Sequence, residues 1–277
     1  MTNSKKTVED LIVYGKSKSS STHAKMLLAS LLNRNPLELL NILDMEVTPD
    51  IIEKYVLKLK ELQENQPIQY VIGKSCFYGN DFLVNKDTLI PRFETEELVE
   101  KTLFYIEKLF SKKELSIIDL GTGTGCIGIT LKKHLPHVKV TLVDIDSNTL
   151  QVTRENAKNL NTEVEIIESD FFTNINQKFD VVISNPPYIK DNEEIEEIVK
   201  NNEPSIALYA GEDGLDCYKK ILSTISNYLN EKYLIAFEIG STQKKDIVNL
   251  IKLYLPNSKI DCYQDLQERD RMIFIYN

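Results

Sequence analysis

The chain has 277 residues, of which 42% are hydrophobic and 27% are charged, and its formal net charge is −9. This composition is typical of a soluble globular protein with one large or two smaller domains, and no apolar run approaches the roughly 20 residues that span a bilayer. The acidic balance argues against binding nucleic acid through a broad basic surface, because neutralising phosphates usually requires an excess of lysine and arginine.

Residues 1–65 are predicted to form a small helical bundle. Four segments of this region carry apolar residues at spacings of three and four, which is the period of an amphipathic helix. Pro49 directly after Thr48 is typical of a helix start, since a proline at the first helical position loses no hydrogen bond. The first ten residues, MTNSKKTVED, contain no apolar stretch like that of a secretory signal, so we expect a cytoplasmic protein.

Residues 66–92 are predicted to link this bundle to a second domain. The runs IQYVIG and CFYGNDFLV are short and rich in β-branched and aromatic residues, which is typical of strands. Gly79-Asn80 lies between two such runs and predicts the turn of a β-hairpin. A proline break in LIPRFETEELVE then leads into an amphipathic helix, whose positive N-terminal end carries three glutamates.

Residues 93–277 are predicted to form an α/β domain with a seven-stranded, mostly parallel sheet. From Ser116 onward, near-continuous apolar strands alternate with amphipathic helices, which is typical of a parallel sheet covered on both faces. The last two strands, KIDCYQ and RMIFIY, have no helix between them. We therefore expect the sheet to end in an antiparallel hairpin.

A glycine-rich turn, Asp119-Leu120-Gly121-Thr122-Gly123-Thr124-Gly125, follows the first strand of the predicted sheet. Its glycines allow a sharp turn and let a ligand lie against the backbone. Gly123, Gly125 and Gly128 also satisfy the G-x-G-x-x-G pattern, so a dinucleotide-binding fold has to be considered. Asp144 ends the next strand, where its carboxylate can accept both hydroxyls of a ribose. Both NAD and S-adenosylmethionine contain that ribose, so the turn alone does not choose between them. Asp119 either supports the turn or contacts the cofactor.

The strand FDVVIS ends in Asn185-Pro186-Pro187-Tyr188. Ligands bind a parallel sheet at the carboxyl ends of its strands. In the Rossmann-like methyltransferases the fourth strand lies beside the first, so a resemblance to their sheet would make this tetrapeptide face the glycine turn. An amide or aromatic amine is a poor nucleophile because its lone pair is delocalised, and it must be oriented to accept a methyl group. The Asn185 oxygen can accept one N–H and the Pro186 carbonyl the other, while Tyr188 can pack on the planar group. The proline run keeps both acceptors fixed, and no strong general base is needed. The simpler alternative is a rigid turn without chemistry.

These motifs resemble those of the release factor glutamine methyltransferases (the HemK/PrmC family). The resemblance covers nearly the whole chain and includes QPIQYVIGKSCFYGNDFLVNKDTLIPRFETEELVE, DLGTGTG, VDID, SDFF, SNPPYI and NEPSIALYAGEDGLDCYKKI. It implies a Rossmann-like class I methyltransferase fold with a small N-terminal helical domain that recognises the substrate. It also implies that S-adenosylmethionine donates a methyl group, with S-adenosylhomocysteine as product. The acceptor would be the glutamine side-chain amide in the Gly-Gly-Gln motif of class 1 peptide chain release factors, which act in translation termination.

The resemblance also assigns roles to individual residues. It implies a cofactor site formed by Gly121, Thr122, Gly123, Thr124, Gly125, Asp144, Asp170, Phe171 and Asn185. Within that site, Phe171 would lie beside the adenine and Asp170 would accept a hydrogen bond from its amino group. The glutamine site would consist of Asn185, Pro186, Pro187 and Tyr188, of which Asn185, Pro186 and Tyr188 would be catalytic. Arg92 and Glu94 fall in the IPR-x-ETE element, which lies near the cofactor pocket in this family.

Two other classes of function remain as alternatives. Methyltransferases that act on an exocyclic amine of adenine or cytosine in nucleic acid use a similar Asn/Asp-Pro-Pro-aromatic element. The acidic balance and the lack of a visible basic target-recognition region weigh against them, because flipping a base requires a duplex-binding surface. A binding module without activity would leave both the glycine turn and the proline motif without a purpose. We expect a monomer whose partners are release factors, with no membrane or direct nucleic-acid binding.

The cysteines and histidines predict no metal site. The four cysteines contain no CxxC pair, so we expect reduced and mostly buried thiols: Cys76, Cys126, Cys217 and Cys262. His134 and His137 flank Pro136, and no other candidate ligands stand near them in the sequence, whereas a zinc site needs three or four converging ligands.

Overall fold

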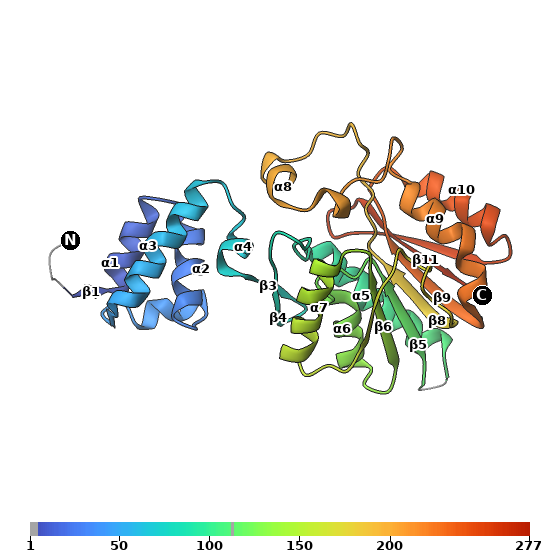
Figure 1. Cartoon of the computed structure of the whole chain (residues 1–277), viewed down its shortest axis with the longest axis horizontal. Helices are drawn as coiled ribbons and strands as arrows, with labels where there is room; N and C mark the ends of the chain where they lie inside the picture. Colours follow the sequence, from blue (N-terminus) through green and yellow to red (C-terminus); the bar gives the residue numbers. More distant parts are fainter. Residues whose placement is uncertain (1–4, 112–113) are drawn as a thin grey trace. The chain divides into compact units, whose positions relative to one another are not determined.

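The computed structural model describes residues 5–111 and 114–277. The first four residues of the predicted helical bundle therefore lie outside the described residues. The chain divides into two compact units, one made of Met1–Lys74 with Glu197–Asn202 and the other of Ser75–Glu196 with Glu203–Asn277 (Figure 1). We call the first the helical unit and the second the sheet unit, and each is described by itself.

The helical unit packs several short helices around one apolar core. Its helices are α1 (Val8–Lys16), α2 (Ser21–Leu31), the 3₁₀ helix η1 (Pro36–Asn41), α3 (Pro49–Gln63), α4 (Ile68–Ile72) and α8 (Glu197–Asn202). Inside the core, the Tyr55 hydroxyl donates a hydrogen bond to the Ala24 carbonyl at 3.1 Å. The predicted bundle is thus confirmed, with one addition. The two-residue strands β1 (Lys6–Thr7) and β2 (Glu46–Val47) form an antiparallel pair that the helical periodicity does not reveal.

The expectation of a strand at IQYVIG is wrong, because Ile68–Ile72 form helix α4. Pro67 precedes the helix and Gly73, with φ of +83°, ends it in the left-handed conformation that glycine adopts without strain. Ile68 and Val71 are three residues apart, so a helix places both on one face, and both are buried in the core of the helical unit. Burial of that face outweighs the strand preference of its β-branched residues.

The predicted β-hairpin is present as β3 (Lys74–Phe77) and β4 (Asn80–Leu83). Its turn lies one residue earlier than Gly79-Asn80, since Tyr78 and Gly79 both have positive φ, as the two central residues of a type I′ turn require. The unfavourable conformation of Tyr78 is supported locally, because its backbone N–H donates to the Glu96 carboxylate at 2.9 Å.

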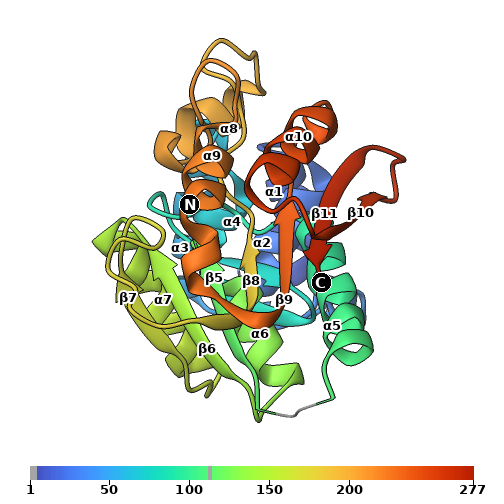
Figure 2. The same cartoon turned by 90° about the vertical axis from the view of Figure 1, so that its right-hand side faces the viewer.

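The sheet unit is built on a seven-stranded sheet in the order β10-β11-β9-β8-β5-β6-β7. The strands are β5 (Ser116–Leu120), β6 (Lys139–Asp144), β7 (Glu165–Glu168), β8 (Phe179–Ser184), β9 (Leu229–Glu238), β10 (Lys259–Gln264) and β11 (Asp270–Tyr276). Strands β7, β6, β5, β8 and β9 run parallel, and β11 is antiparallel to both β9 and β10 (Figure 2). The predicted fold class and its final antiparallel hairpin are confirmed.

Helices cover both faces of this sheet, because successive side chains of a strand point to opposite sides. Ile117 packs in a core cluster with α5 (Phe93–Leu109), α6 (Cys126–His134) and α7 (Ser147–Asn159), whereas its neighbour Ile118 packs in a second cluster with α9 (Asp216–Thr224) and α10 (Lys244–Tyr254). Two 3₁₀ turns, η2 (Ser205–Ala207) and η3 (Ile225–Tyr228), flank α9. Burial on both faces explains why the strands are apolar almost throughout. Within residues 5–111 and 114–277, no helix combines the length and apolar character needed to cross a bilayer.

A buried asparagine of α7 joins the hairpin to the glycine turn. The Asn156 side-chain oxygen accepts from the Leu83 N–H at 2.7 Å, and its NH₂ group donates to the carbonyls of Leu83 at 3.1 Å and Thr124 at 2.9 Å. A second contact lies beside it, where the Thr149 hydroxyl donates to the Asp87 carbonyl at 2.6 Å. These bonds fix the segment that follows β4 against the carboxyl ends of β5 and β6.

Candidate functional site

A cavity of about 330 Å³ opens at the carboxyl ends of the parallel strands. The chain forms β5, β6 and β7 on one side and then returns to place β8 on the other side of β5, so the cavity lies where the strand order reverses. Its volume is in the range of small-ligand and cofactor pockets. Among the predicted site residues, those that line it are Gly121, Gly123, Asp144, Asp170, Phe171, Asn185 and Pro187.

The glycine turn has a backbone that requires glycine at three positions. Gly121, Gly123 and Gly125 have φ of +68°, +56° and +81°, values that residues with a Cβ rarely adopt. The turn is held to the neighbouring strand by the Thr122 N–H, which donates to the Val143 carbonyl at 2.9 Å. Apart from each glycine and its two chain neighbours, no atom of the described residues lies within 4 Å of where a Cβ on Gly121 or Gly123 would stand. The turn therefore leaves open space beside its backbone on the cavity side of β5.

Asp119 supports this turn from within the core. One oxygen of its fully buried carboxylate accepts from the Thr122 hydroxyl at 2.7 Å and from the Gly128 N–H at 3.0 Å, which ties the turn to the first turn of α6. The other oxygen has no partner among the described residues. Burial raises the pKa of Asp119 to about 7, against the lowering effect of these two hydrogen bonds. Of the two roles that the sequence allowed, the observed contacts are those of turn support.

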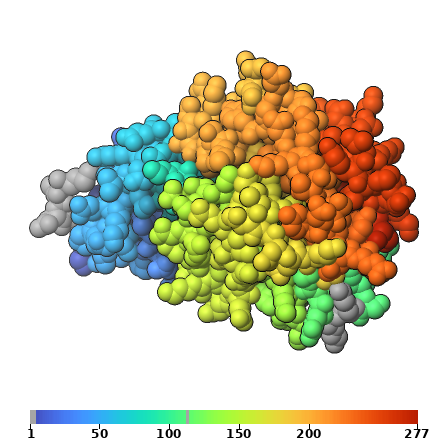
Figure 3. Space-filling model, turned by 45° about the vertical axis from the view of Figure 1, so that its right-hand side comes forward, coloured from blue at the N-terminus to red at the C-terminus, as the bar shows by residue number. Residues whose placement is uncertain are grey.

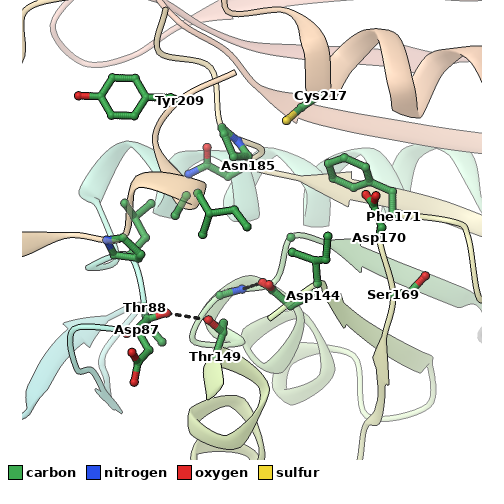
Figure 4. Close-up of a pocket in the computed structure, with 18 of the residues that line it drawn as sticks. Asp87, Thr88, Asp144, Thr149, Ser169, Asp170, Phe171, Asn185, Tyr209 and Cys217 are labelled. Atoms are coloured by element: carbon green, nitrogen blue, oxygen red, sulfur yellow. Dashed lines mark hydrogen bonds between the residues drawn. The ribbon is translucent and has the colours of Figure 1, made fainter. Parts of the chain in front are cut away.

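Asp144 ends β6 on the floor of the cavity (Figure 4). Its two oxygens each accept one backbone N–H, from Gly123 at 2.9 Å and from Asp146 at 3.2 Å. A carboxylate has about four acceptor positions, so both oxygens keep capacity for a ligand. Burial raises the pKa of Asp144, partly offset by these backbone donors. The carboxylate is thus a desolvated acceptor whose hydrogen-bonding capacity is not yet filled.

Ser169, Asp170 and Phe171 lie together on one side of the cavity, across from Asp87 and Thr88 (Figure 4). Phe171 has φ of +49°, an unfavourable conformation for an aromatic residue, which places its ring at the cavity wall.

A lysine of α9 contacts this side of the cavity and lines the cavity itself. Lys220 forms an ion pair with Asp170, and its ammonium lies 5.9 Å from the centre of the Phe171 ring. In the space-filling view, the yellow residues that follow β7 adjoin the orange residues around α9 (Figure 3). The acid and the ring are therefore held in place by a contact from a distant part of the sequence.

The four residues of the Asn-Pro-Pro-Tyr motif face different surroundings. The Asn185 NH₂ group donates to the Thr95 hydroxyl at 3.2 Å, and Asn185 and Pro187 line the cavity. Pro186 and Tyr188 are not among the lining residues in the described part of the chain. The Tyr188 ring packs against the core under α9 and α10, and its hydroxyl lies 3.5 Å from the Glu238 carboxylate. Its stacking on a substrate group therefore stays a prediction.

A partly buried ion pair joins two segments that adjoin lining residues of the cavity. The Glu203 side chain, only 2% exposed, accepts from the guanidinium of Arg92 and from the Ile90 N–H at 3.1 Å. This contact fixes the segment before α5 beside the residues that lead into η2. Arg92 therefore has a structural partner here.

Several lining residues have no counterpart among the sequence predictions: Asp87, Thr88, Leu89, Ile206, Tyr209, Cys217 and Lys220. They come from two segments far apart in the chain, and no spacing rule places such segments at one sheet edge. Glu238, which lies behind Asn185, carried a usable signal. It ends β9, as Asp144 ends β6, and it lies near the end of the predicted strand YLIAFEIG, so the same reasoning applies to both.

The cysteines and histidines take no part in a metal cluster within the described residues, where no group of three or more His, Cys, Asp or Glu side chains converges. All four cysteines are free thiols, and Cys126 is buried whereas Cys76 is exposed. The His134 ring lies 2.9 Å from the carbonyl of Thr130, one turn earlier in α6.

In comparisons with known proteins, two family models match parts of this chain. Residues 92–202 match the Methyltransferase small domain, and residues 14–73 match the PrmC N-terminal domain. A Release factor glutamine methyltransferase from Bacillus anthracis is 38% identical over 255 residues, which cover 90% of this chain and 90% of that protein. One from Streptococcus pneumoniae is 39% identical over 236 residues, with coverage of 84% of this chain and 83% of that protein.

Among solved structures, a 16S rRNA methyltransferase from T. thermophilus in complex with AdoMet and guanosine superposes with a TM-score of 0.54. It is 12% identical and covers 74% of this chain and 49% of that chain. At this identity the similarity concerns the fold, which is that of the class I methyltransferases.

We predict that Asp119→Asn flattens the pH dependence of stability. The raised pKa means that the folded protein keeps a proton that the unfolded chain has lost. The contribution of Asp119 to stability is therefore full below its ordinary pKa of 3.8 and is lost as the pH rises through about 7. Asparagine mimics the protonated side chain, so the variant should lose less free energy of unfolding between pH 5 and about pH 8 than the wild type does.

Urea unfolding followed by circular dichroism across this pH range measures the effect. The exposed Asp191→Asn change is the control and should reproduce the wild-type profile. Some slope will remain in Asp119→Asn, because burial also raises the pKa of Glu238 to about 7. A profile for Asp119→Asn that runs parallel to the wild type would contradict the assignment.

Proposed function

The chain belongs to the release factor glutamine methyltransferases, and on this premise we propose that it methylates the glutamine of the Gly-Gly-Gln motif in class 1 peptide chain release factors, using S-adenosylmethionine. The methyl group goes to the side-chain amide nitrogen. The observation that carries the proposal is the position of Asn185 in the same cavity as Gly121, Gly123 and Asp144. One cavity thus combines a place for a nucleoside-like cofactor with an acceptor for an N–H group.

The residues of the cavity fit S-adenosylmethionine. The open space beside Gly121 and Gly123 admits a ligand against the backbone, and Asp144 retains acceptor capacity for two ribose hydroxyls. Phe171 offers an aromatic face to the adenine, and Asp170 beside it offers an acceptor for the adenine amino group. Support also comes from the T. thermophilus methyltransferase of the same fold, which is in complex with AdoMet. When bound, the cofactor supplies a methyl group on an electrophilic sulfonium.

Asn185 and Pro186 orient the nitrogen that receives this methyl group. The Asn185 NH₂ group is engaged by Thr95, so its oxygen remains to accept one N–H of the substrate amide. The Pro186 carbonyl would accept the other N–H, and together the two acceptors would fix the direction of the nitrogen lone pair for methyl transfer. The nitrogen would accept the methyl group that the bound cofactor supplies, and one N–H proton would then leave to water.

The three regions of the chain have different roles. We assign substrate recognition to the helical bundle of residues 1–65. Residues 66–92 act as the linker, and residues 93–277 carry out methyl transfer. The match of residues 14–73 to the PrmC N-terminal domain supports a role of the bundle in binding release factors. The protein acts as a monomer in the cytoplasm, with release factors as its partners.

Methylation of adenine or cytosine in nucleic acid is the alternative activity. The relatives that cover 84–90% of this chain are named for release factor glutamine methylation, and the net charge of −9 does not suit a duplex-binding enzyme. Both observations favour the protein substrate.

We predict that Asp144→Asn weakens binding of S-adenosylmethionine by about 10-fold to 100-fold, the range expected when charged hydrogen bonds to two hydroxyls are lost. Asparagine keeps the size of the side chain but replaces one acceptor oxygen by a donor. Isothermal titration calorimetry measures the affinity. Glu168→Gln is the matched control, because this exposed residue ends β7 directly beside Asp144 but does not line the cavity. Equal losses in the two variants would contradict the assignment of Asp144.

The proposed function itself is tested with labelled S-adenosylmethionine and three acceptors: a release factor, the same factor with its motif glutamine changed to alanine, and DNA. We expect label in the unchanged factor alone. Asn185→Ala should remove turnover while cofactor affinity weakens only modestly, because the amide orients the substrate nitrogen. Label on DNA, or undiminished label on the changed factor, would overturn the proposal.

A further inference from the structure

A buried carboxylate lies directly behind the proposed catalytic asparagine. Glu238 is the last residue of β9 and is 1% exposed, and β9 pairs in parallel with β8, after which Asn185 follows. One Glu238 oxygen accepts a hydrogen bond from the Thr95 hydroxyl at 2.6 Å. Thr95 lies in the first turn of α5 and is itself buried. Neither residue lines the cavity, and of their contacts the mechanism above uses only the one between Thr95 and Asn185.

The single proton of the Thr95 hydroxyl decides how the Asn185 amide is turned. An ionised carboxylate can only accept, so that proton is directed to Glu238. The Thr95 oxygen is then an acceptor for its other neighbour, which is the Asn185 side chain at 3.2 Å. Only the NH₂ end of the amide can donate there, because the opposite orientation would bring two acceptors together. The Asn185 oxygen is consequently left on the side of the cavity.

The ionised form of Glu238, on which this arrangement depends, predominates above about pH 7. Burial raises the pKa of Glu238 to about 7, while the Thr95 hydrogen bond and the positive charge of Arg271 lower it. The Arg271 guanidinium lies 3.4 Å from the Tyr188 hydroxyl, which in turn lies 3.5 Å from Glu238. The ionised, accepting form of the carboxylate is therefore the main form at about pH 8.

We propose that Glu238 and Thr95 form a relay that holds the Asn185 side-chain oxygen toward the cavity, and that both are positioning residues for methyl transfer. This inference rests on the proposed function of Asn185 and deepens it. An amide turned the other way would present NH₂ to the NH₂ of the substrate, two donors that cannot bond. The relay therefore acts on the orientation of the substrate nitrogen and leaves cofactor binding untouched.

The relay is tested by Thr95→Val, which keeps the shape of the side chain and removes its hydroxyl. At pH 8 we expect kcat to fall by about 10-fold to 100-fold, while KM for the release factor and affinity for S-adenosylmethionine change by less than about threefold. Thr95→Ser retains the hydroxyl and should restore most of kcat. The matched control is Thr102→Val, a fully buried position of the same helix whose hydroxyl donates only to the Leu98 carbonyl at 2.7 Å. Its kcat should equal that of the wild type.

The part played by Glu238 is tested by combining substitutions. Glu238→Gln introduces a donor that can reverse the Thr95 hydroxyl, and we expect kcat to fall by about fivefold or more in the wild type but by less than about twofold in Thr95→Val. An equal fall in both backgrounds would show that Glu238 does not act through Thr95. Should Thr95→Val not fold, the fall in Glu238→Gln at full cofactor affinity decides the question, and unchanged kcat there overturns the relay.

A measurement without turnover separates this inference from the proposed function. The Asn185 side-chain NH₂ gives amide signals that nuclear magnetic resonance identifies by their loss in Asn185→Ala. We expect slow hydrogen exchange of these signals in the wild type and in Thr95→Ser, and fast exchange in Thr95→Val. Equal exchange in all three overturns the relay even if release factors are methylated. Slow exchange in a protein that methylates no release factor would leave the relay intact and refute the function.

Discussion

The site depends on one constraint, which is that parallel strands β6, β5, β8 and β9 end at the same edge of the sheet. Each strand delivers a polar group there at a spacing that the ladder fixes. Asp144 ends β6, the glycine turn follows β5, Asn185 follows β8, and Glu238 ends β9. Because the strand order reverses at β5, the helices leave this edge open, and the cavity forms beside the ends of β6, β5 and β8, with Glu238 behind Asn185.

At two of these strand ends, those of β5 and β9, a buried carboxylate holds neighbouring residues in place. Asp119 fixes the glycine turn and Glu238 holds Thr95, and burial raises the pKa of each to about 7. Removing a charge from water is unfavourable, so both acids are poor choices for stability alone. Their value is geometric, since a carboxylate in its ionised form can only accept and so fixes the direction of the hydroxyls and N–H groups bonded to it. Proteins commonly accept such local destabilisation at functional sites.

Much of this arrangement follows from the sequence, and the exceptions have identifiable physical causes. Ligands bind a parallel sheet at the carboxyl ends of its strands, and we call this the strand-end rule. It predicts that Asp144 and Asn185 lie at the ligand site, because the prediction needs only the order and direction of the strands. The helix at Ile68–Ile72 escapes sequence reasoning, since burial against a core outweighs local strand preference. The link between Arg92 and Glu203 joins residues 111 positions apart, and nothing local signals such a contact. Glu238 was within reach of the strand-end rule, whereas its bond to Thr95 required the packing of α5 against β9.

The central claim is that this cavity holds a glutamine amide between the Asn185 oxygen and the Pro186 carbonyl. The most direct measurement is a crystal structure of the protein with S-adenosylhomocysteine and a peptide containing the Gly-Gly-Gln motif. The account predicts the glutamine nitrogen within about 2.7–3.2 Å of both acceptors, with the cofactor ribose on Asp144. A glutamine side chain bound outside the cavity, or a nitrogen that meets neither acceptor, would contradict it.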